Sequence, residues 1–120
     1  MKRKILIVDD EPEVLEVLKK KLEAENFIVI TASDGLEGLK QVKTENPDLI
    51  LLDVIMPNKD GFAMLNDLQA DEKLRKIPVI MATAKGDSSS VFNGQYLGAI
   101  DYLIKPIDFR QLLKYINRYS

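Results

Sequence analysis

The sequence predicts an α/β domain in which a parallel sheet lies between two layers of helices. Five short apolar runs alternate with segments whose apolar residues recur at helical spacing. The runs are rich in Ile, Val and Leu and show no period-two polarity, which is typical of strands buried on both faces of a parallel sheet. This alternation favours a three-layer domain with right-handed crossovers.

The five predicted strands are all short and apolar. They cover residues 4–8, 27–31, 48–53, 77–82 and 100–104. Their spacing along the chain leaves room for one helix after each strand, as a parallel sheet requires.

Three of the four helices predicted with clear helical spacing begin or end at recognisable signals. Pro12 suits the first turn of one helix, Asn46-Pro47 should end another, and Asp108 can cap the last. The predicted helices cover residues 12–25, 35–44, 61–71 and the segment from Asp108 through Ile116.

The segment 86–99 is expected to form only a short or frayed fourth helix. Asn93-Gly94 lies in its middle, and glycine costs about 1 kcal/mol relative to alanine inside a helix. No charged residue occurs from Ser88 to Ile100. Two interpretations remain open: a poorly formed but packed helix, or an uncharged and malleable surface for a partner.

Composition limits the chemistry that is available. A chain of 120 residues suits one domain, covering residues 1–120. Seventeen basic and nineteen acidic residues give a net charge of −2, which does not favour binding to nucleic acid or to an anionic membrane. Without cysteine or histidine, the chain lacks disulfides, thiolate catalysis, cysteine-based zinc sites and the commonest general base. Carboxylates, hydroxyls, amines and any hard cation that they bind remain.

The N-terminus carries three basic residues, as a signal peptide does, but only four apolar residues follow before Asp9. The apolar core of a signal peptide needs about 7–15 residues. No run approaches the roughly 18 residues of a membrane span. We therefore expect a cytoplasmic protein with no membrane partner and no direct nucleic-acid partner.

Polar residues that can handle phosphate or metal lie at the ends of four predicted strands. If those strands are neighbours in a parallel sheet, the residues meet at its carboxyl edge, where open α/β sheets bind ligands. They are Asp9, Asp10, Asp53, Thr83 and Lys105. Singly, each has an ordinary explanation as a cap, turn, strand-end or solvated residue, so the prediction depends on their joint placement.

Three adjacent carboxylates repel one another unless a cation is present. Oxygen ligands without histidine or cysteine favour Mg²⁺ over zinc. A carboxylate beside Mg²⁺ can act as a nucleophile toward phosphorus, while an ammonium and a hydroxyl offset the charge of the phosphoryl oxygens. The residue types therefore fit metal-assisted phosphoryl transfer onto an aspartate.

From about residue 3 to residue 118, the chain resembles a response-regulator receiver domain of two-component signalling, of the chemotaxis-regulator type. The matching motifs are Val8-Asp9-Asp10-Glu11-Pro12, Leu52-Asp53-Val54-Ile55-Met56-Pro57 with Asp60-Gly61, Ala82-Thr83-Ala84 and Asp101-Tyr102-Leu103-Ile104-Lys105-Pro106. The resemblance implies a flavodoxin-like (βα)5 fold whose five parallel strands have the order 2-1-3-4-5.

The resemblance also implies a role for each acidic residue. Asp53 would accept a phosphoryl group from a sensor histidine kinase, a histidine phosphotransfer protein or a small phosphodonor. Asp10, Asp53 and the backbone carbonyl of Ile55 would ligate Mg²⁺, with Mn²⁺ as a possible substitute. Asp9 would act mainly through a water molecule bound to the metal.

Three further residues would complete the switch. Lys105, in a cis peptide bond with Pro106, would contact Asp53 and the phosphoryl group. Thr83 would move to donate to a phosphoryl oxygen, and Tyr102 would swing from an exposed to a buried position behind it. The response would be read by a downstream effector protein or domain on the face formed by the fourth helix, the fifth strand and the fifth helix.

Tyr115 and Tyr119 lie one helical turn apart on that face. They are either solvent-exposed aromatic residues without a role or part of a dimer or partner contact. We expect a monomer that can dimerise when phosphorylated.

Three positions depart from residues common in the family. Ile55 is bulky and apolar where small polar residues are frequent, and Lys85 is basic where an acidic or small residue is common. In the family, both positions line the approach of the hydrolytic water. We hypothesise that this combination slows self-dephosphorylation. Ile100 replaces a residue that is often polar, but it leaves every site assignment unchanged.

Two rival functions compete with the expected switch, which acts on itself and is not a turnover enzyme. One is a pseudo-receiver that binds partners independently of phosphorylation, although the intact acidic residues argue against it. The other is a Mg²⁺-dependent phosphohydrolase, which commonly carries an acidic residue at the position of Ile55.

Overall fold

The computed structural model describes residues 2–54, 60–84 and 98–120 of the 120-residue chain. Within these ranges, five parallel strands form one sheet in the order β2-β1-β3-β4-β5, which confirms the expected flavodoxin-like topology. The strands are β1 (Lys4–Val8), β2 (Ile28–Ala32), β3 (Leu49–Asp53), β4 (Val79–Thr83) and β5 (Asp101–Ile104).

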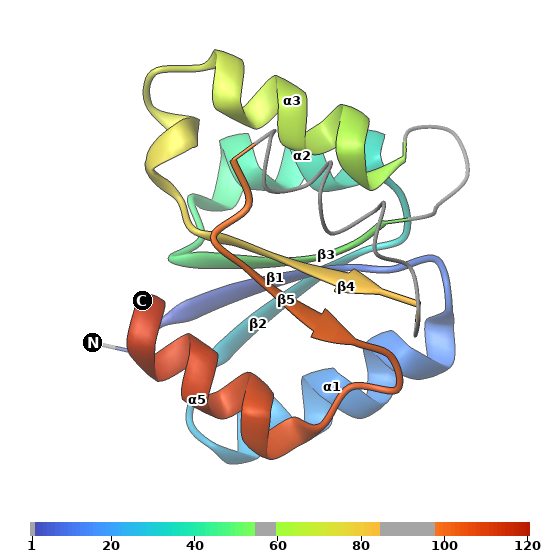
Figure 1. The fold of residues 1–120 in the computed structure, drawn as a ribbon. Helices are drawn as coiled ribbons and strands as arrows, with labels where there is room; N and C mark the ends of the chain where they lie inside the picture. Colours follow the sequence, from blue (N-terminus) through green and yellow to red (C-terminus); the bar gives the residue numbers. More distant parts are fainter. Residues whose placement is uncertain (1, 55–59, 85–97) are drawn as a thin grey trace.

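Helices cover both faces of this sheet, with α2 and α3 on one side and α1 and α5 on the other (Figure 1). They are α1 (Pro12–Ala24), α2 (Gly35–Glu45), α3 (Gly61–Ala70), a short 3₁₀ helix (Leu74–Lys76) and α5 (Phe109–Tyr119). Most of the expected fourth helix, over 86–99, lies outside the described residues. No helix of the described ranges is long and apolar enough to cross a bilayer.

The capping signals of the sequence work as expected. Pro12 lies in the first turn of α1, and the Asp108 carboxylate accepts hydrogen bonds from the backbone N–H groups that open α5. α2 ends at Asn46, which adopts a left-handed conformation with φ of 49°. The last helix extends beyond the expected Ile116, as far as Tyr119.

Four of the five strands begin one or two residues later than predicted, and one of these shifts has a clear reason. The expected strand 27–31 begins one residue later, at Ile28. The backbone N–H of Phe27 donates to the carbonyl oxygen of Leu22 at 3.1 Å, so Phe27 closes the end of α1. Hydrogen bonding between β2 and the β1 segment starts only at Ile28, whose N–H donates to the carbonyl oxygen of Arg3, the residue before β1, at 2.9 Å.

Two apolar layers hold the helices on the sheet. Because successive side chains of a strand point to opposite faces, Leu6 and Ile50 pack toward α2 and α3, whereas Ile7 and Leu51 pack toward α1 and α5. Burying one such side chain contributes roughly 1.5–3 kcal/mol. Burial on both faces explains why the strands read as continuous apolar runs.

The strand order creates the position for a site. β1 and β3 are neighbours at the centre of the sheet, although β2 lies between them in the sequence. The chain therefore continues from β1 into α1 and from β3 toward α3, and these two helices lie on opposite faces of the sheet. Open α/β sheets bind ligands in the crevice that such a reversal leaves.

Candidate functional site

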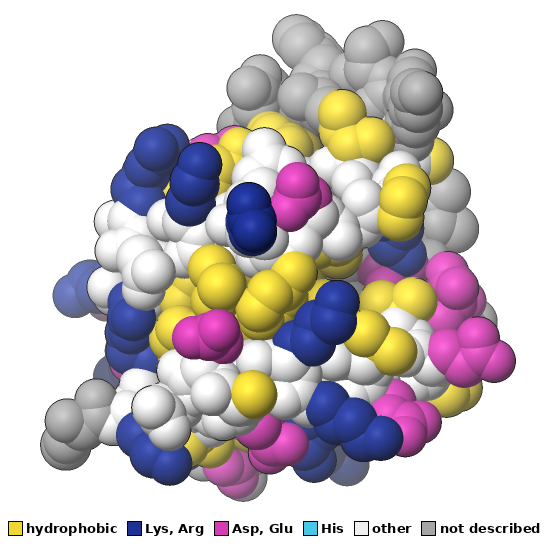
Figure 2. All heavy atoms as spheres, turned by 90° about the horizontal axis from the view of Figure 1, so that it is seen from below, with side chains coloured by type: hydrophobic (Ala, Val, Ile, Leu, Met, Phe, Trp, Pro, Cys, Tyr) yellow, Lys and Arg dark blue, Asp and Glu magenta, His cyan; other side chains and the backbone are white. Residues whose placement is uncertain are grey.

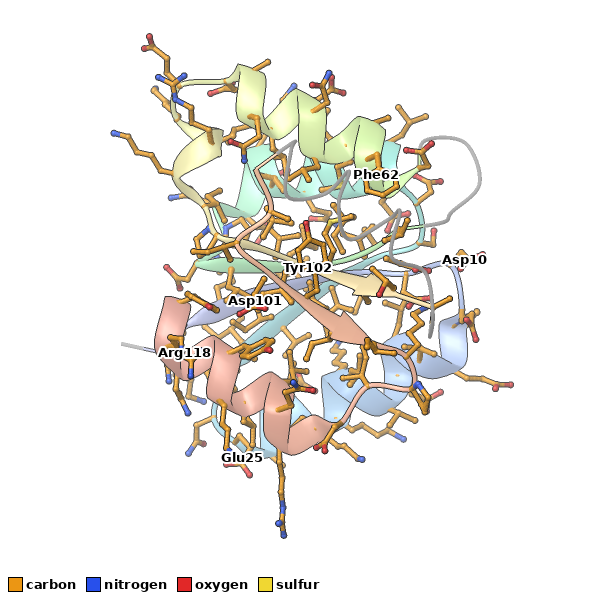
Figure 3. All side chains as sticks on the ribbon, in the orientation of Figure 1. Asp10, Glu25, Phe62, Asp101, Tyr102 and Arg118 are labelled. Carbon is orange, nitrogen blue, oxygen red and sulfur yellow. The ribbon has the colours of Figure 1, made fainter. Side chains whose placement is uncertain are left out.

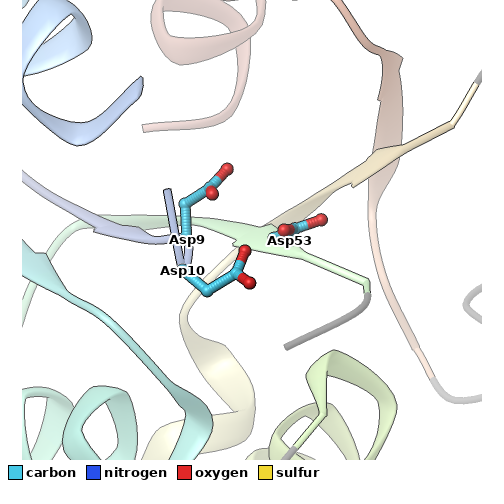
Figure 4. A group of neighbouring side chains, drawn as sticks. All are labelled: Asp9, Asp10 and Asp53. Carbon is cyan, nitrogen blue, oxygen red and sulfur yellow. The ribbon is translucent and has the colours of Figure 1, made fainter. Parts of the chain in front are cut away.

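Three aspartates converge at the carboxyl ends of β1 and β3. Asp9 and Asp10 directly follow β1, and Asp53 is the last residue of β3. The register pairs Val8 with Leu52, so the residues that follow each of them lie side by side. One carboxylate oxygen from each aspartate lies within 4.8 Å of the others. Figure 4 shows the three side chains at this edge of the sheet.

A lysine that follows the edge strand β5, at the same carboxyl end of the sheet, reaches this group. Lys105 follows β5, and its Nζ lies 2.9 Å from Asp9 Oδ2 and 3.1 Å from Asp53 Oδ2. Its backbone N–H donates to the Thr83 carbonyl oxygen at 2.8 Å, and its peptide bond to Pro106 is cis, as expected. Lys105 therefore links β5 to the carboxylates at the centre of the sheet.

Burial makes this cluster electrostatically unusual. Asp9 is 3% exposed and Asp53 is 8% exposed, whereas Asp10 lies at the surface. Burial raises the pKa of Asp53, the negative charge of Asp9 raises it further, and Lys105 offsets only part of this effect. The carboxylates thus outnumber the ammonium that faces them, which favours binding of a further cation.

The lysine responds in the complementary way. Burial alone would lower the pKa of Lys105, but its hydrogen bonds and attraction to Asp9 and Asp53 outweigh that effect and raise the pKa. Lys105 therefore stays positively charged at neutral pH, where it can neutralise an anion placed next to Asp53.

The residues of the cluster fit a Mg²⁺ ion, because they offer carboxylate oxygens and excess negative charge. Asp9 has both oxygens engaged: Oδ1 accepts from the Glu11 backbone N–H at 2.9 Å, and Oδ2 binds Lys105. Asp10 and Asp53 are therefore better placed as direct ligands than Asp9. The third expected ligand, the carbonyl of Ile55, lies outside the described residues, as does Lys85.

The two expected switch residues lie on β4 and β5. Thr83 is the last residue of β4 and is 2% exposed. The ring of Tyr102 packs against the core on the α2 and α3 side, and its hydroxyl oxygen is already buried in this structure. Burial, with a smaller contribution from the charge of Asp101, raises the pKa of Tyr102 to about 12.

Sequence reasoning missed the role of Gly61. A Cβ atom at this position would lie 2.2 Å from the backbone carbonyl oxygen of Asp53, so a side chain there would push against the strand end. The N–H of Gly61 also donates to the Val54 carbonyl oxygen at 2.9 Å. The Asp-Gly pair at the start of α3 could have suggested this close approach.

A groove of about 570 Å³ beside the acidic cluster was also missed. The N-terminal half of α1 and the loop after β5 form it, and Val17 is 50% exposed there. On the face in Figure 2, where α1 and α5 lie, apolar side chains form a strip between charged ones. The groove is lined by Glu11, Glu13, Val14, Val17, Leu18, Ala84, Lys105, Pro106 and Ile107. Glu11 and Lys105 belong to both the groove and the surroundings of the cluster, since Glu11 Oε1 lies 3.8 Å from Lys105 Nζ.

Comparisons with known proteins agree with this geometry. Residues 5–117 match the family model described as response regulator receiver domain. The alkaline phosphatase synthesis transcriptional regulatory protein PhoP of Bacillus subtilis is 43% identical over 93% of this chain and 46% of its own length. Protein PilH of Pseudomonas aeruginosa is 40% identical over 95% of this chain and 94% of its own length.

Solved structures show the same fold. Chemotaxis protein CheY4 of Vibrio cholerae superposes with a TM-score of 0.93 and 28% identity, with all of both chains covered. A response regulator from Chloroflexus aurantiacus gives a TM-score of 0.94 and 32% identity over 99% of this chain and 98% of its own. Several curated relatives are longer regulators, and the chain spans less than half the length of these relatives.

Proposed function

This chain belongs to the response regulator receiver family, and we propose that it is a two-component signalling switch in which Asp53 accepts a phosphoryl group. The observation that carries this proposal is the convergence of Asp9, Asp10 and Asp53 within 4.8 Å, with Lys105 Nζ 3.1 Å from Asp53. A nucleophilic carboxylate, oxygen ligands for Mg²⁺ and a fixed ammonium are the groups that this transfer needs.

In the proposed reaction, a carboxylate oxygen of Asp53 attacks the phosphorus atom of a phosphohistidine. The new O–P bond forms as the P–N bond breaks, and the electron pair returns to the imidazole nitrogen of the donor, which takes up a proton. Asp10 and Asp53 would hold Mg²⁺, which supplies positive charge for the phosphoryl oxygens when it is bound. Lys105 supplies a second positive charge, with its Nζ 3.1 Å from Asp53 Oδ2.

The remaining residues stabilise the product. Asp9 keeps Lys105 directed into the cluster, since it binds the ammonium at 2.9 Å. The hydroxyl of Thr83, at the end of the neighbouring strand, can donate to a phosphoryl oxygen after a small movement. Phosphorylation then favours one of two arrangements of the domain by these differential contacts.

The groove beside the cluster suits the phosphodonor, which would be a sensor histidine kinase or a histidine phosphotransfer protein. A donor must bring its imidazole to Asp53, and the groove shares Glu11 and Lys105 with the surroundings of that residue. Its apolar floor fits the apolar stripe of a helix, and its acidic rim at Glu11 and Glu13 fits basic side chains.

The output would be contact with a downstream effector protein or domain through β5, α5 and the uncharged segment 88–100. The protein would work in the cytoplasm as a phosphoacceptor, not as a turnover enzyme, and would be monomeric until phosphorylated. It would act through protein partners, without direct contacts to nucleic acid or to a membrane.

The test is the intact mass of the protein after incubation with acetyl phosphate and Mg²⁺. The wild type should gain one phosphoryl group, and Asp53→Asn should gain none. Asp48→Asn, at the opposite end of the sheet, is the matched control and should behave as the wild type. The gain should disappear when EDTA removes the metal.

An equal gain of mass in Asp53→Asn would contradict the proposal. No gain in a wild-type protein that demonstrably binds Mg²⁺ would favour the phosphorylation-independent binding module or strict dependence on a cognate kinase. Release of free phosphate over many turnovers would instead indicate a phosphohydrolase.

A further inference from the structure

A hydrogen-bonded bridge joins the last turn of α5 to the first residue of β5. The hydroxyl of Tyr119 donates to Asp101 Oδ2 at 2.6 Å, and this bond raises the pKa of the Tyr119 hydroxyl. The other oxygen, Asp101 Oδ1, accepts from the backbone N–H of Tyr102 at 2.8 Å. Both oxygens of Asp101 are therefore engaged, one by the helix and one by the strand.

The bridge restrains the backbone at the point where Tyr102 is attached. Rotation about the Asp101 Cα–C bond would move the Tyr102 N–H away from Asp101 Oδ1. The carboxylate could follow only by turning Oδ2 away from the Tyr119 hydroxyl, because both oxygens belong to one planar group. β5 is an edge strand of the described sheet and pairs with β4 alone. A strand with a single neighbour is less constrained by its ladder, so a side-chain bridge has more influence on it.

The side chains of the two residues point to opposite faces of the sheet, as Figure 3 shows. Asp101 faces α5, while the ring of Tyr102 packs among the core residues on the α2 and α3 side. A constraint applied on the α5 side is thereby transmitted through one peptide unit to the opposite face.

The buried state of Tyr102 needs such support. Its hydroxyl oxygen is buried and has no hydrogen-bond partner in the part of the chain that the structure describes. A hydroxyl in that position loses its bonds to water without replacement, so burial of this group is unfavourable by itself. Packing of the ring and the fixed backbone must stabilise it.

We propose that Tyr119 is a positioning residue that acts through Asp101 to hold Tyr102 with its hydroxyl buried before any phosphoryl group is present. The last turn of α5 and Tyr102 then move as one unit, so a partner that binds α5 changes the position of Tyr102 and the reverse. The inference rests on the proposed signalling switch only in treating Tyr102 as the switch residue that the resemblance to receiver domains implies.

Tyr119→Phe tests this directly, because it removes one hydroxyl and keeps the ring. In unphosphorylated, metal-free protein, the population with an exposed Tyr102 hydroxyl should rise about fivefold, as expected for the loss of one hydrogen bond. Photo-CIDNP NMR, which detects accessible tyrosines, should show a new Tyr102 signal. The pKa of Tyr102 should fall from about 12 toward its ordinary value of 10.0.

Tyr115→Phe is the matched control on the same helix. Tyr115 lies one turn earlier, with its ring centroid 6.0 Å from that of Tyr119, but its hydroxyl accepts from Gln111 Nε2 at 3.3 Å instead of reaching Asp101. This variant should leave both Tyr102 readouts unchanged.

A double-mutant cycle separates a positioning role from a merely structural one. If Tyr119 acts through Asp101, Tyr119→Phe should add no further exposure of Tyr102 in an Asp101→Ala background. Faster amide exchange at the end of α5 with an unchanged Tyr102 would overturn the inference, and so would additive effects in the cycle. Because none of these measurements involves phosphorylation, failure of Asp53 to accept a phosphoryl group would leave them interpretable.

Discussion

The charged residues at the two ends of the β-sheet differ in burial: they lie near the surface at the amino end and are largely buried at the carboxyl end. At the amino end, Lys4 lies near the surface, with Nζ 3.1 Å from the Glu45 carbonyl oxygen and 3.5 Å from its carboxylate. The Asp48 carboxylate accepts from the Lys4 backbone N–H at 2.7 Å. At the carboxyl end, buried Asp9 and Asp53 both bind the same ammonium, that of Lys105.

The difference shows which end serves stability and which serves binding. At the amino end, Lys4 contacts Glu45 and Asp48 near the surface, so their charges cost little. These contacts join the start of β1 to the end of α2 and the start of β3. The carboxyl end keeps excess negative charge in a buried position, which is unfavourable until a cation arrives. Substitutions of the same chemical kind should therefore have different or even opposite effects at the two ends.

The largest difference is expected for removal of a lysine. Lys105→Met leaves two buried carboxylates facing each other and should destabilise the fold by about 3 kcal/mol at neutral pH. Lys4→Met, the matched change at the amino end, should cost under about 1 kcal/mol because that pair is largely exposed. Urea unfolding of both variants measures the difference, and equal losses would show that the two ends do not differ.

Addition of Mg²⁺ should stabilise the wild type, because the ion offsets the repulsion among the carboxylates at the carboxyl end. At a concentration one hundred times the dissociation constant, the gain is about 2.7 kcal/mol. Thermal unfolding with Mg²⁺ and with EDTA measures it. Asp10→Ala should abolish most of the gain, while Asp48→Ala should keep it; a gain that survives in Asp10→Ala would place the ion elsewhere.

Gly61→Ala should disturb the carboxyl end through its backbone. The new Cβ would approach the Asp53 carbonyl oxygen to 2.2 Å, which requires a shift of the strand end and costs about 2 kcal/mol. Gly38→Ala is the control, because its Cβ would meet side chains and not backbone: the flexible Met64 side chain at 2.9 Å and Val8 Cγ2 at 3.0 Å. Urea unfolding compares the two, and Mg²⁺ affinity should fall only in Gly61→Ala. A larger loss in Gly38→Ala would contradict this interpretation.

The smallest change in the free energy of unfolding is expected when an aspartate is replaced by asparagine. Its sign should differ between the two ends of the sheet. The pKa of Asp53 is raised in the folded protein, so its contribution to stability is present below its ordinary value of 3.8 and is lost as the pH rises through the raised value. Without metal at pH 7, Asp53→Asn should therefore be slightly more stable than the wild type, with Lys105 still paired to Asp9.

Asp48→Asn should instead lower the free energy of unfolding by less than about 1 kcal/mol, because it weakens the hydrogen bond from the Lys4 N–H. Unfolding curves between pH 3 and pH 7 measure both variants, and the gain in Asp53→Asn should shrink toward the acid limit. A loss of stability in Asp53→Asn at pH 7 would mean that Lys105 fully compensates the cluster.

Local patterns in the sequence determined the elements and the candidate site. Apolar runs such as Ile5–Val8 identify buried strands by composition alone. Pro12 marks a helix start through its fixed backbone angle, and Asp108 marks one through its side-chain carboxylate. Asp9 and Asp53 could be placed on one edge because parallel strands must end on the same side. The strand order came from the resemblance to receiver domains, since an apolar run does not specify its neighbour.

Only the tertiary structure decided which side chains meet across long stretches of sequence. The Tyr119 bond to Asp101 spans 18 residues and the Lys105 bond to Asp9 spans 96, and the groove at Val17 joins α1 to the loop after β5. Periodicity reports the face of one element, whereas these contacts depend on crossover paths, strand register and packing. Burial and pKa follow from the same packing, so the electrostatic character of Asp53 could not be found from its place in the sequence.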